Sequence, residues 1–275
     1  MSAFRLVQIT DLHVRPDDTP LSGRVLTRPY TAAAIDRILA LHPPPDAVIV
    51  TGDLTDIGTP EEYALLRAEI DRLPMPVYAI PGNHDRREEM RAAFADHAYM
   101  PGEGALRWVI DDHPLRLIGL DSVVPGHGHG TLDAESLAWL DRQLDVDTRP
   151  TIVAIHHPPF PTGIPAMDAI GCLNGSEMAA VIAQHGHVER VIAGHHHRPV
   201  QVLWAGTMAM ISPSVAHQVN LDMEPRDRPR MVMEPPAFLL HQWQDGRGLI
   251  SHQVYVDTCG GPLPFRLDPD YPGQS

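Results

Sequence analysis

The chain has 275 residues, 43% of them hydrophobic, and a formal net charge of −14. This length and composition suit one large α/β unit with a substantial core. The acidic charge argues against long nucleic acid and against an anionic membrane as partners, because both attract clustered Lys and Arg.

No apolar run approaches the roughly 20 residues needed to span a bilayer. Met1–Gln8 does not resemble a signal peptide, so we expect a cytoplasmic protein. The two cysteines, Cys172 and Cys259, are too few for a disulfide scaffold or a thiolate metal site. The unusual number is 17 histidines against 21 Lys plus Arg. Histidine is the commonest metal ligand, so the positions of these residues come next.

Short β-branched runs alternate with segments of helical periodicity over the first two thirds of the chain. One helix has a clear start: Thr59 is placed as N-cap, Pro60 takes the first helical position and Glu62 completes a capping box. The predicted helices are Thr31–Leu41, Pro60–Leu73, Arg86–Ala95, Asp133–Leu144 and Ser176–Gln184. The predicted strands are Phe4–Thr10, Ala47–Thr51, Val77–Ile80, Trp108–Ile110, Leu115–Leu120, Thr151–Ile155, Val188–Ala193, Val200–Trp204, Met208–Ser212, Ala237–Gln242 and Leu249–Val256. This order predicts a layered α/β fold with antiparallel strands added at the end.

Five short polar segments follow predicted strands. They are Asp11-Leu-His13, Gly52-Asp53, Gly82-Asn83-His84-Asp85, His156-His157 and Gly194-His195-His196-His197. Loops at the carboxyl ends of strands are where α/β folds bind ligands. Each segment alone is compatible with an ordinary polar turn or a helix cap, so the prediction depends on finding all five together.

Spacing within two of these segments suggests shared ligation. Residues two apart in an extended segment point the same way, so Asp11 and His13 are expected to reach one ion. The same argument pairs His195 with His197 and directs His196 away. Together the segments supply oxygen donors and four imidazoles, which overfill one four-coordinate zinc site but suit two ions that share a carboxylate. Such donors favour Fe, Mn, Co or Zn, and the sequence does not choose among these four.

In this order the segments resemble the signature of the calcineurin-like metallophosphoesterases: D-x-H, GD, GNH[DE], H and GHxH. The resemblance extends from Asp11 to at least His217. More narrowly, the chain resembles class III cyclic-nucleotide phosphodiesterases and, especially, the related bacterial glycerophosphodiesterases. Further matching segments are Pro60-Glu61-Glu62-Tyr63, His156-His157-Pro158-Pro159, Met167-Asp168-x-Ile170, Asn174-Gly175 and His217-Gln218.

The resemblance implies a four-layered α/β/β/α sandwich with a small C-terminal strand-and-loop extension. It also implies that one ion is held by Asp11, His13, Asp53 and His197. The second would be held by Asp53, Asn83, His156 and His195, with Asp53 as the bridge. His84 is expected to contact the substrate phosphate, either stabilising developing charge or protonating the leaving group. His217 resembles a further phosphate-contacting residue.

The domain limits follow from this resemblance. Residues 1–217 form the core of the catalytic domain, and 237–265 complete it with the final strands. The intervening 218–236 is dense in Pro, Met and charge, which predicts a loop, a cap over the site or an oligomer contact. Residues 266–275 are expected to form a loosely attached tail.

The resemblance implies hydrolysis of a small phosphodiester, such as 3′,5′-cyclic AMP or a glycerophosphodiester, by a hydroxide that bridges two divalent ions. His84, Asp53 and Asn83 are the candidate catalytic residues, and Asn83, His84 and His217 the candidate substrate contacts. A phosphomonoesterase or nuclease of the same family is an alternative, since the ligand set is shared. A non-catalytic scaffold is the alternative from another class, but such members lose motif residues, and none is lost here.

The remaining histidines match no motif and are expected at the surface or in structural roles. They are His113, His127, His129, His185, His187, His241 and His252. His127 and His129 lie in Gly126-His-Gly-His-Gly130, which we interpret as a connection because glycines surround both. His157 and His196, beside ligands, are expected to be structural neighbours.

Overall fold

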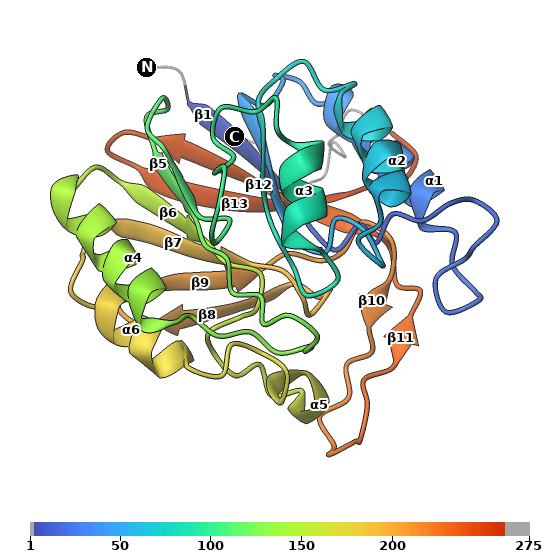
Figure 1. Cartoon of the computed structure of the whole chain (residues 1–275). Coiled ribbons are helices and arrows are strands. Elements are labelled where there is room, and N and C mark those ends of the chain that lie inside the picture. The colour runs from blue at the N-terminus through green and yellow to red at the C-terminus, as the bar shows by residue number, and fades with distance from the viewer. Residues whose placement is uncertain (1–2, 262–275) are drawn as a thin grey trace, which may run out of the picture.

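Two stacked β-sheets form the centre of the molecule, and the computed structural model describes residues 3–261 (Figure 1). The first sheet has the order β13-β12-β1-β2-β3, with strands β1 Phe4–Ile9, β2 Ala47–Thr51, β3 Val77–Ile80, β12 Ala237–Gln244 and β13 Gly248–Tyr255. The second has the order β4-β5-β6-β7-β9-β8, with strands β4 Trp108–Ile110, β5 Arg116–Gly119, β6 Thr151–Ala154, β7 Val188–Ala193, β8 Val200–Trp204 and β9 Thr207–Ile211.

Helices cover the outer face of each sheet, so the predicted four-layered sandwich is confirmed. On the first sheet lie α1 Thr27–Leu39, α2 Pro60–Ile70 and α3 Arg87–Ala93. On the second lie α4 Ala134–Val146 and α6 Gly175–Ile182. The short α5 Pro165–Asp168 and the hairpin of β10 Gln218–Val219 and β11 Met231–Val232 lie apart from both sheets.

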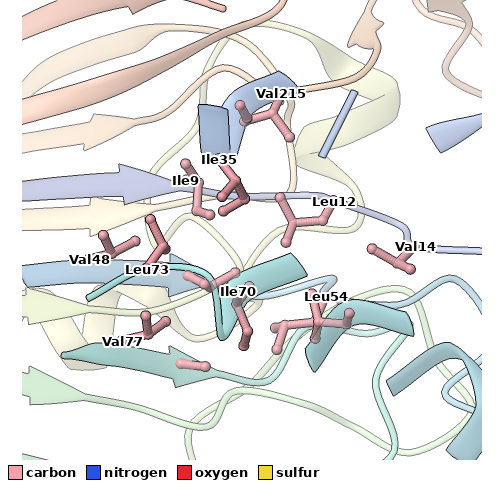
Figure 2. Packing of buried hydrophobic residues seen from close by; sticks show 14 of the residues in the cluster. Ile9, Leu12, Val14, Ile35, Val48, Leu54, Ile70, Leu73, Val77 and Val215 are labelled. Carbon is pink, nitrogen blue, oxygen red and sulfur yellow. The ribbon is translucent and has the colours of Figure 1, made fainter. Parts of the chain in front are cut away.

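Successive side chains of a strand point to opposite faces, so the first sheet contributes both to the core under its helices and to the core between the sheets. On β1, Val7 and Ile9 pack against the helices, whereas Leu6 faces the second sheet. Figure 2 shows the helix-side cluster, in which Ile9 and Val48 of the sheet lie beside Ile35 and Ile70 of α1 and α2.

A buried polar chain also joins the two sheets. His241 of β12 lies with Nδ1 2.7 Å from Ser251 Oγ and Nε2 3.1 Å from Gln8 Oε1. The amide of Gln8 donates in turn to the Ala193 carbonyl of β7 at 2.9 Å, across the sheet interface. Because His241 is fully buried and its ring nitrogens are engaged, it has the structural role that the sequence predicted.

The start of α1, the short helix α5 and the β10–β11 hairpin differ from the sequence prediction. Helix α1 begins at Thr27 rather than Thr31, although Pro29 lies in its first turn, where proline is tolerated. The Thr27 hydroxyl donates to the His13 carbonyl at 2.6 Å, so a tertiary contact defines this start. The segment 218–236, whose sequence has neither helical nor strand periodicity, contains the β10–β11 hairpin. The predicted tail 266–275 lies outside the described residues.

None of the helices within residues 3–261 has the length and apolar character needed to cross a membrane.

Candidate metal centre

The predicted ligands follow strands whose carboxyl ends meet at one rim of the two sheets. Strands β1, β2 and β3 run parallel in one sheet, and β6 and β7 run parallel in the other. Each ligand lies two to four residues beyond the strand that carries it. They are Asp11 and His13 after β1, Asp53 after β2, Asn83 after β3, His156 after β6, and His195 and His197 after β7.

Five of these residues have left-handed backbone. The φ angles are 54° for Asp11, 44° for His13, 50° for Asp53, 68° for His195 and 52° for His197. A non-glycine residue in this region costs of order 1–3 kcal/mol and persists only where its surroundings enforce it. The extended geometry that we assumed for Asp11-x-His13 and His195-x-His197 is therefore wrong, although both pairs still face the rim.

The first group of converging side chains consists of Asp11, His13, Asp53 and His197. Their ligating atoms all lie within 4.8 Å of one another, and all four side chains are buried. His197 Nε2 lies 3.2 Å from Asp11 Oδ1, and His13 Nε2 lies 3.6 Å from Asp53 Oδ2.

The ring hydrogens indicate what this group can bind. The Nδ1 of His197 donates to the His217 carbonyl at 2.9 Å, and that of His13 faces Asp56 Oδ1 at 3.3 Å. With both Nδ1 atoms engaged, the neutral rings have bare Nε2 atoms, and these face each other at 3.3 Å. Two opposed lone pairs repel each other unless a cation lies beside them. The donor set therefore fits a divalent ion.

A second group lies on the other side of Asp53. His156 Nε2 lies 3.4 Å from Asp53 Oδ1 and 3.3 Å from Asn83 Oδ1, while its Nδ1 donates to the Thr51 carbonyl at 2.8 Å. Within residues 3–261, the buried Nε2 of His195 has no hydrogen-bond partner, which fits a metal-donor atom. His157 also lies with His156 and His195, so it is a further candidate donor.

The electrostatics of the centre also favour cations. Burial raises the pKa of Asp53, but the neighbouring His156 and His84 outweigh it and hold that pKa well below its usual range. Burial likewise lowers the pKa of His156, but Asp53 outweighs it and raises the value to about 9. Two buried carboxylates, Asp11 and Asp53, thus favour positive charge beside them, which divalent ions would supply.

Gly52 and Gly82 are required because neighbouring ligand side chains lie too close to leave room for a Cβ atom. A Cβ on Gly82 would lie 2.2 Å from Asp53 Oδ1, and one on Gly52 would lie 2.2 Å from His156 Nδ1. Gly52 also has a φ of 96°. Each of these glycines precedes one ligand and makes room for a different one.

Asp85 fixes the conformation of the loop that carries Asn83. Its carboxylate accepts hydrogen bonds from the backbone amides of Gly82 at 2.9 Å and Leu54 at 3.1 Å, and from the Tyr63 hydroxyl at 2.9 Å. Tyr63 comes from α2, whose capping box of Thr59 and Glu62 is present as predicted. Sequence reasoning missed this role, although the Glu62-Tyr63 match was its signal.

His84 faces solvent beside the two groups. Its side chain is 39% exposed, against 4% or less for His13 and Asp53. The backbone amide of His84 donates to Asp53 Oδ1 at 2.9 Å, and its Nδ1 lies 2.8 Å from the Asp56 carbonyl. Burial lowers the pKa of His84, but Asp53 and Asp56 outweigh it and raise the value to about 10. Asp56, which also accepts from Arg15 at 3.0 Å, is a second residue that sequence reasoning missed.

A cleft of about 480 Å³, here called the metal cleft, opens over the centre. The predicted residues Asp53, Asn83, His84, His195 and His217 line it. One wall comes from Met167 of α5 and from Ile170, which follows this helix. The β10–β11 hairpin adds Val219, Arg230 and Met231 to that wall. His217 is buried, and burial together with His197 and His13 lowers its pKa to about 2, so this ring is neutral.

Known proteins resemble this chain in sequence. The family model described as calcineurin-like phosphoesterase matches residues 4–199. A probable glycerophosphodiester phosphodiesterase GpdQ of Arcobacter nitrofigilis is 37% identical over 262 residues, covering 94% of this chain and 96% of that protein. The 3′,5′-cyclic adenosine monophosphate phosphodiesterase CpdA of Escherichia coli K12 is 30% identical over 215 residues, covering 78% and 77%.

The fold also occurs in solved structures. A dimetal phosphatase of Danio rerio superposes with a TM-score of 0.65 at 15% identity, covering 92% of this chain and 99% of that one. Fold, rim and donor set define a protein built to hold a pair of divalent metal ions. The chain belongs to the calcineurin-like phosphoesterase family.

Proposed function

We propose that this chain is a dinuclear metal-dependent phosphodiesterase that hydrolyses small phosphodiesters. The observation that carries the proposal is Asp53, whose two carboxylate oxygens face the two groups separately, His13 on one side and His156 on the other. A carboxylate in this position suits a bridge between two ions. The names of both phosphodiesterase relatives support a diester substrate.

In this proposal one ion is held by Asp11, His13, Asp53 and His197. The other is held by Asp53, Asn83, His156 and His195. When bound, such a pair lowers the pKa of a coordinated water and neutralises charge on phosphate oxygens. Fe, Mn, Co and Zn all suit imidazole and oxygen donors.

The protein's own residues orient the diester and manage protons. Asn83 and His84 lie at the exposed edge of the centre, where a phosphate enters. His84 Nδ1 is engaged by the Asp56 carbonyl, so Nε2 is the atom free to face the leaving group. Hydrolysis joins the oxygen of water to phosphorus and breaks the bond to the leaving alcohol, whose oxygen keeps the electron pair and takes a proton from His84. The proton that the attacking water loses passes to solvent, and one proton from solvent returns to His84, so the net reaction consumes one water molecule. His217, neutral and buried beside the cleft, contacts the phosphate.

The test is a substrate panel on protein stripped of metal and then reconstituted with Mn, Co or Zn. The panel comprises bis(p-nitrophenyl) phosphate, p-nitrophenyl phosphate, 3′,5′-cyclic AMP and glycerophosphoethanolamine. We expect metal-dependent turnover of the diesters above that of the monoester. Higher monoester turnover would instead favour a phosphomonoesterase, and no turnover by fully loaded protein would favour a scaffold.

The segment 218–236 is proposed as a cap, because its hairpin lines the metal cleft through Val219 and Met231. Arg198 anchors it by donating to the Val219 carbonyl and to Glu234 Oε2, both at 2.7 Å. We further propose that the chain acts in the cytoplasm and that copies self-associate through this segment, where Met223 is 66% exposed. Sedimentation of the wild type and of Met223→Ser tests the association, which the substitution should weaken.

A further inference from the structure

A second cleft adjoins the metal cleft on the far side of His84. It measures about 750 Å³ and shares Asp56, Asn83 and His84 with the metal cleft. One wall is the start of α3, with Glu88 and Glu89, and the other is the loop Val123–Gly128 that follows β5. We call it the outer cleft.

Hydrogen bonds hold the two walls of the outer cleft in place. Arg87 of α3 donates to Asp121 Oδ1 at 2.8 Å and to the Val123 carbonyl at 2.6 Å, so it ties the two walls together. The loop closes on itself through the bridge between Val123 and Gly130, and it is supported from below by His157, whose Nδ1 lies 2.8 Å from Ser122 Oγ. Gly126, His127 and Gly128 of the glycine-rich motif thus lie at the rim of a cleft that reaches His84.

The outer cleft has a mixed lining, in which charged side chains lie beside Ile57, Val123 and Pro125. Asp56 is paired with Arg15, Arg87 with Asp121, and Glu88 with Arg91 at 3.5 Å. Glu89 has no ion-pair partner among the described residues, and His127 on the opposite wall is exposed. Both can accept hydrogen bonds from a ligand.

No Phe, Tyr or Trp lines either cleft within the part of the chain that the structure describes. A nucleobase therefore lacks one of these large rings to stack on. The two clefts meet at Asn83 and His84, which lets the two ester groups of an acyclic diester extend in different directions. A 3′,5′-cyclic nucleotide has both ester oxygens on one ribose and no second group to place.

From this geometry we propose that the outer cleft is a subsite for one ester group of an acyclic phosphodiester, a small alcohol that carries hydroxyl or ammonium groups. Glu89 and His127 bind those groups, and the phosphate remains at the metal centre. The proposal rests on the proposed phosphodiesterase function and adds to it a specificity-determining site.

Three variants test the subsite. Glu89→Gln removes the unpaired charge, and His127→Ala removes the opposite donor and acceptor. Gly128→Leu fills the cleft: no atom lies within 4 Å of a Cβ at this position, and its φ lies outside the left-handed region. Glu103→Gln, His252→Ala and Gly186→Leu make the same changes at exposed positions that line neither cleft.

The measurement is kcat/KM with glycerophosphoethanolamine, glycerophosphoglycerol, bis(p-nitrophenyl) phosphate and 3′,5′-cyclic AMP. We expect each cleft variant to lower kcat/KM for the glycerophosphodiesters about fivefold to tenfold, the change that loss of one polar contact produces. Gly128→Leu should leave cyclic AMP within about twofold of wild type, and the three control variants should match wild type. A loss in Glu89→Gln confined to the ethanolamine diester identifies an ammonium ligand, and an equal loss on both identifies hydroxyl groups.

Two failures are distinguishable. If wild-type protein does not hydrolyse bis(p-nitrophenyl) phosphate, the proposed function itself fails. If it does, but the cleft variants leave all ratios between substrates unchanged, the subsite is refuted. Equal losses on every substrate, cyclic AMP included, would also refute it, because they would reflect a general disturbance of the centre.

Discussion

The hydroxyl of Tyr63 donates a 2.9 Å hydrogen bond to Oδ1 of Asp85, and through it helix α2 supports the loop that carries Asn83. Tyr63 is 1% exposed, so if its hydroxyl is removed, water cannot take its place as the donor to Asp85. We expect Tyr63→Phe to lower the free energy of unfolding by about 2 kcal/mol, the usual contribution of a buried hydrogen bond to a charged group. Urea denaturation measures the change. Tyr30→Phe, at a half-buried position where no hydroxyl contact is found among the described residues, should have little effect.

Single substitutions should lower the occupancy of the two ion sites to different extents. Asp53→Asn weakens the carboxylate that faces both groups, whereas Asn83→Ala removes a donor near His156 only. We expect elemental analysis to find Asp53→Asn depleted of both ions and Asn83→Ala depleted of one, each with a native circular dichroism spectrum. Two retained ions and unchanged activity in Asn83→Ala would contradict the ligand assignment.

Gly82→Ala should disturb the centre without touching a ligand directly. The added Cβ would lie 2.2 Å from Asp53 Oδ1 and 2.3 Å from the Asp53 backbone nitrogen, so the loop has to move. We expect a loss of stability of roughly 1–3 kcal/mol, typical of overpacking, together with weaker metal binding. Calorimetry with metal titration measures both. Gly186→Ala, where a Cβ meets open space, provides the control and should keep both properties.

The buried His241 should make stability depend on pH. Burial lowers its pKa to about 3, whereas an unfolded histidine has a pKa of about 6.5. Between these values the unfolded chain binds more protons, so this residue's contribution to stability falls as the pH falls below about 6.5. Each pH unit in that window costs up to about 1.4 kcal/mol. His241→Gln should flatten the dependence in urea unfolding from pH 7 to pH 4.5. An unchanged slope would contradict the assignment, and exposed His252→Gln should keep the wild-type slope.

The layered fold could be predicted because its signals are local. The capping box of Thr59 and Glu62 and the alternation of buried strands with amphipathic segments need no knowledge of distant residues. Helix α5, with four residues, and the β10–β11 hairpin, with two residues in each strand, carry too little periodicity to be recognised. The start of α1 depends on a contact between Thr27 and His13, which no local pattern contains.

The candidate centre was predictable to a similar degree. Motif order placed the seven ligand positions at one rim, and the structure brings them together. Asp56 and Arg15 were not predicted, because an Asp in a loop has no signature until its neighbours are known. The outer cleft was missed for the same reason, since His127 meets the start of α3 only through the fold.

The left-handed backbone at Asp11, His13, Asp53, His195 and His197 has a consequence for how this protein can change in evolution. Glycine would adopt each of these conformations without steric cost, so in metal-free protein the backbone at these positions favours glycine over the ligand side chains. Their retention would then record selection for metal binding at the expense of thermal robustness. A library selected only for heat resistance should drift toward glycine at these five positions, and the metal centre would be the first part of the molecule to disappear.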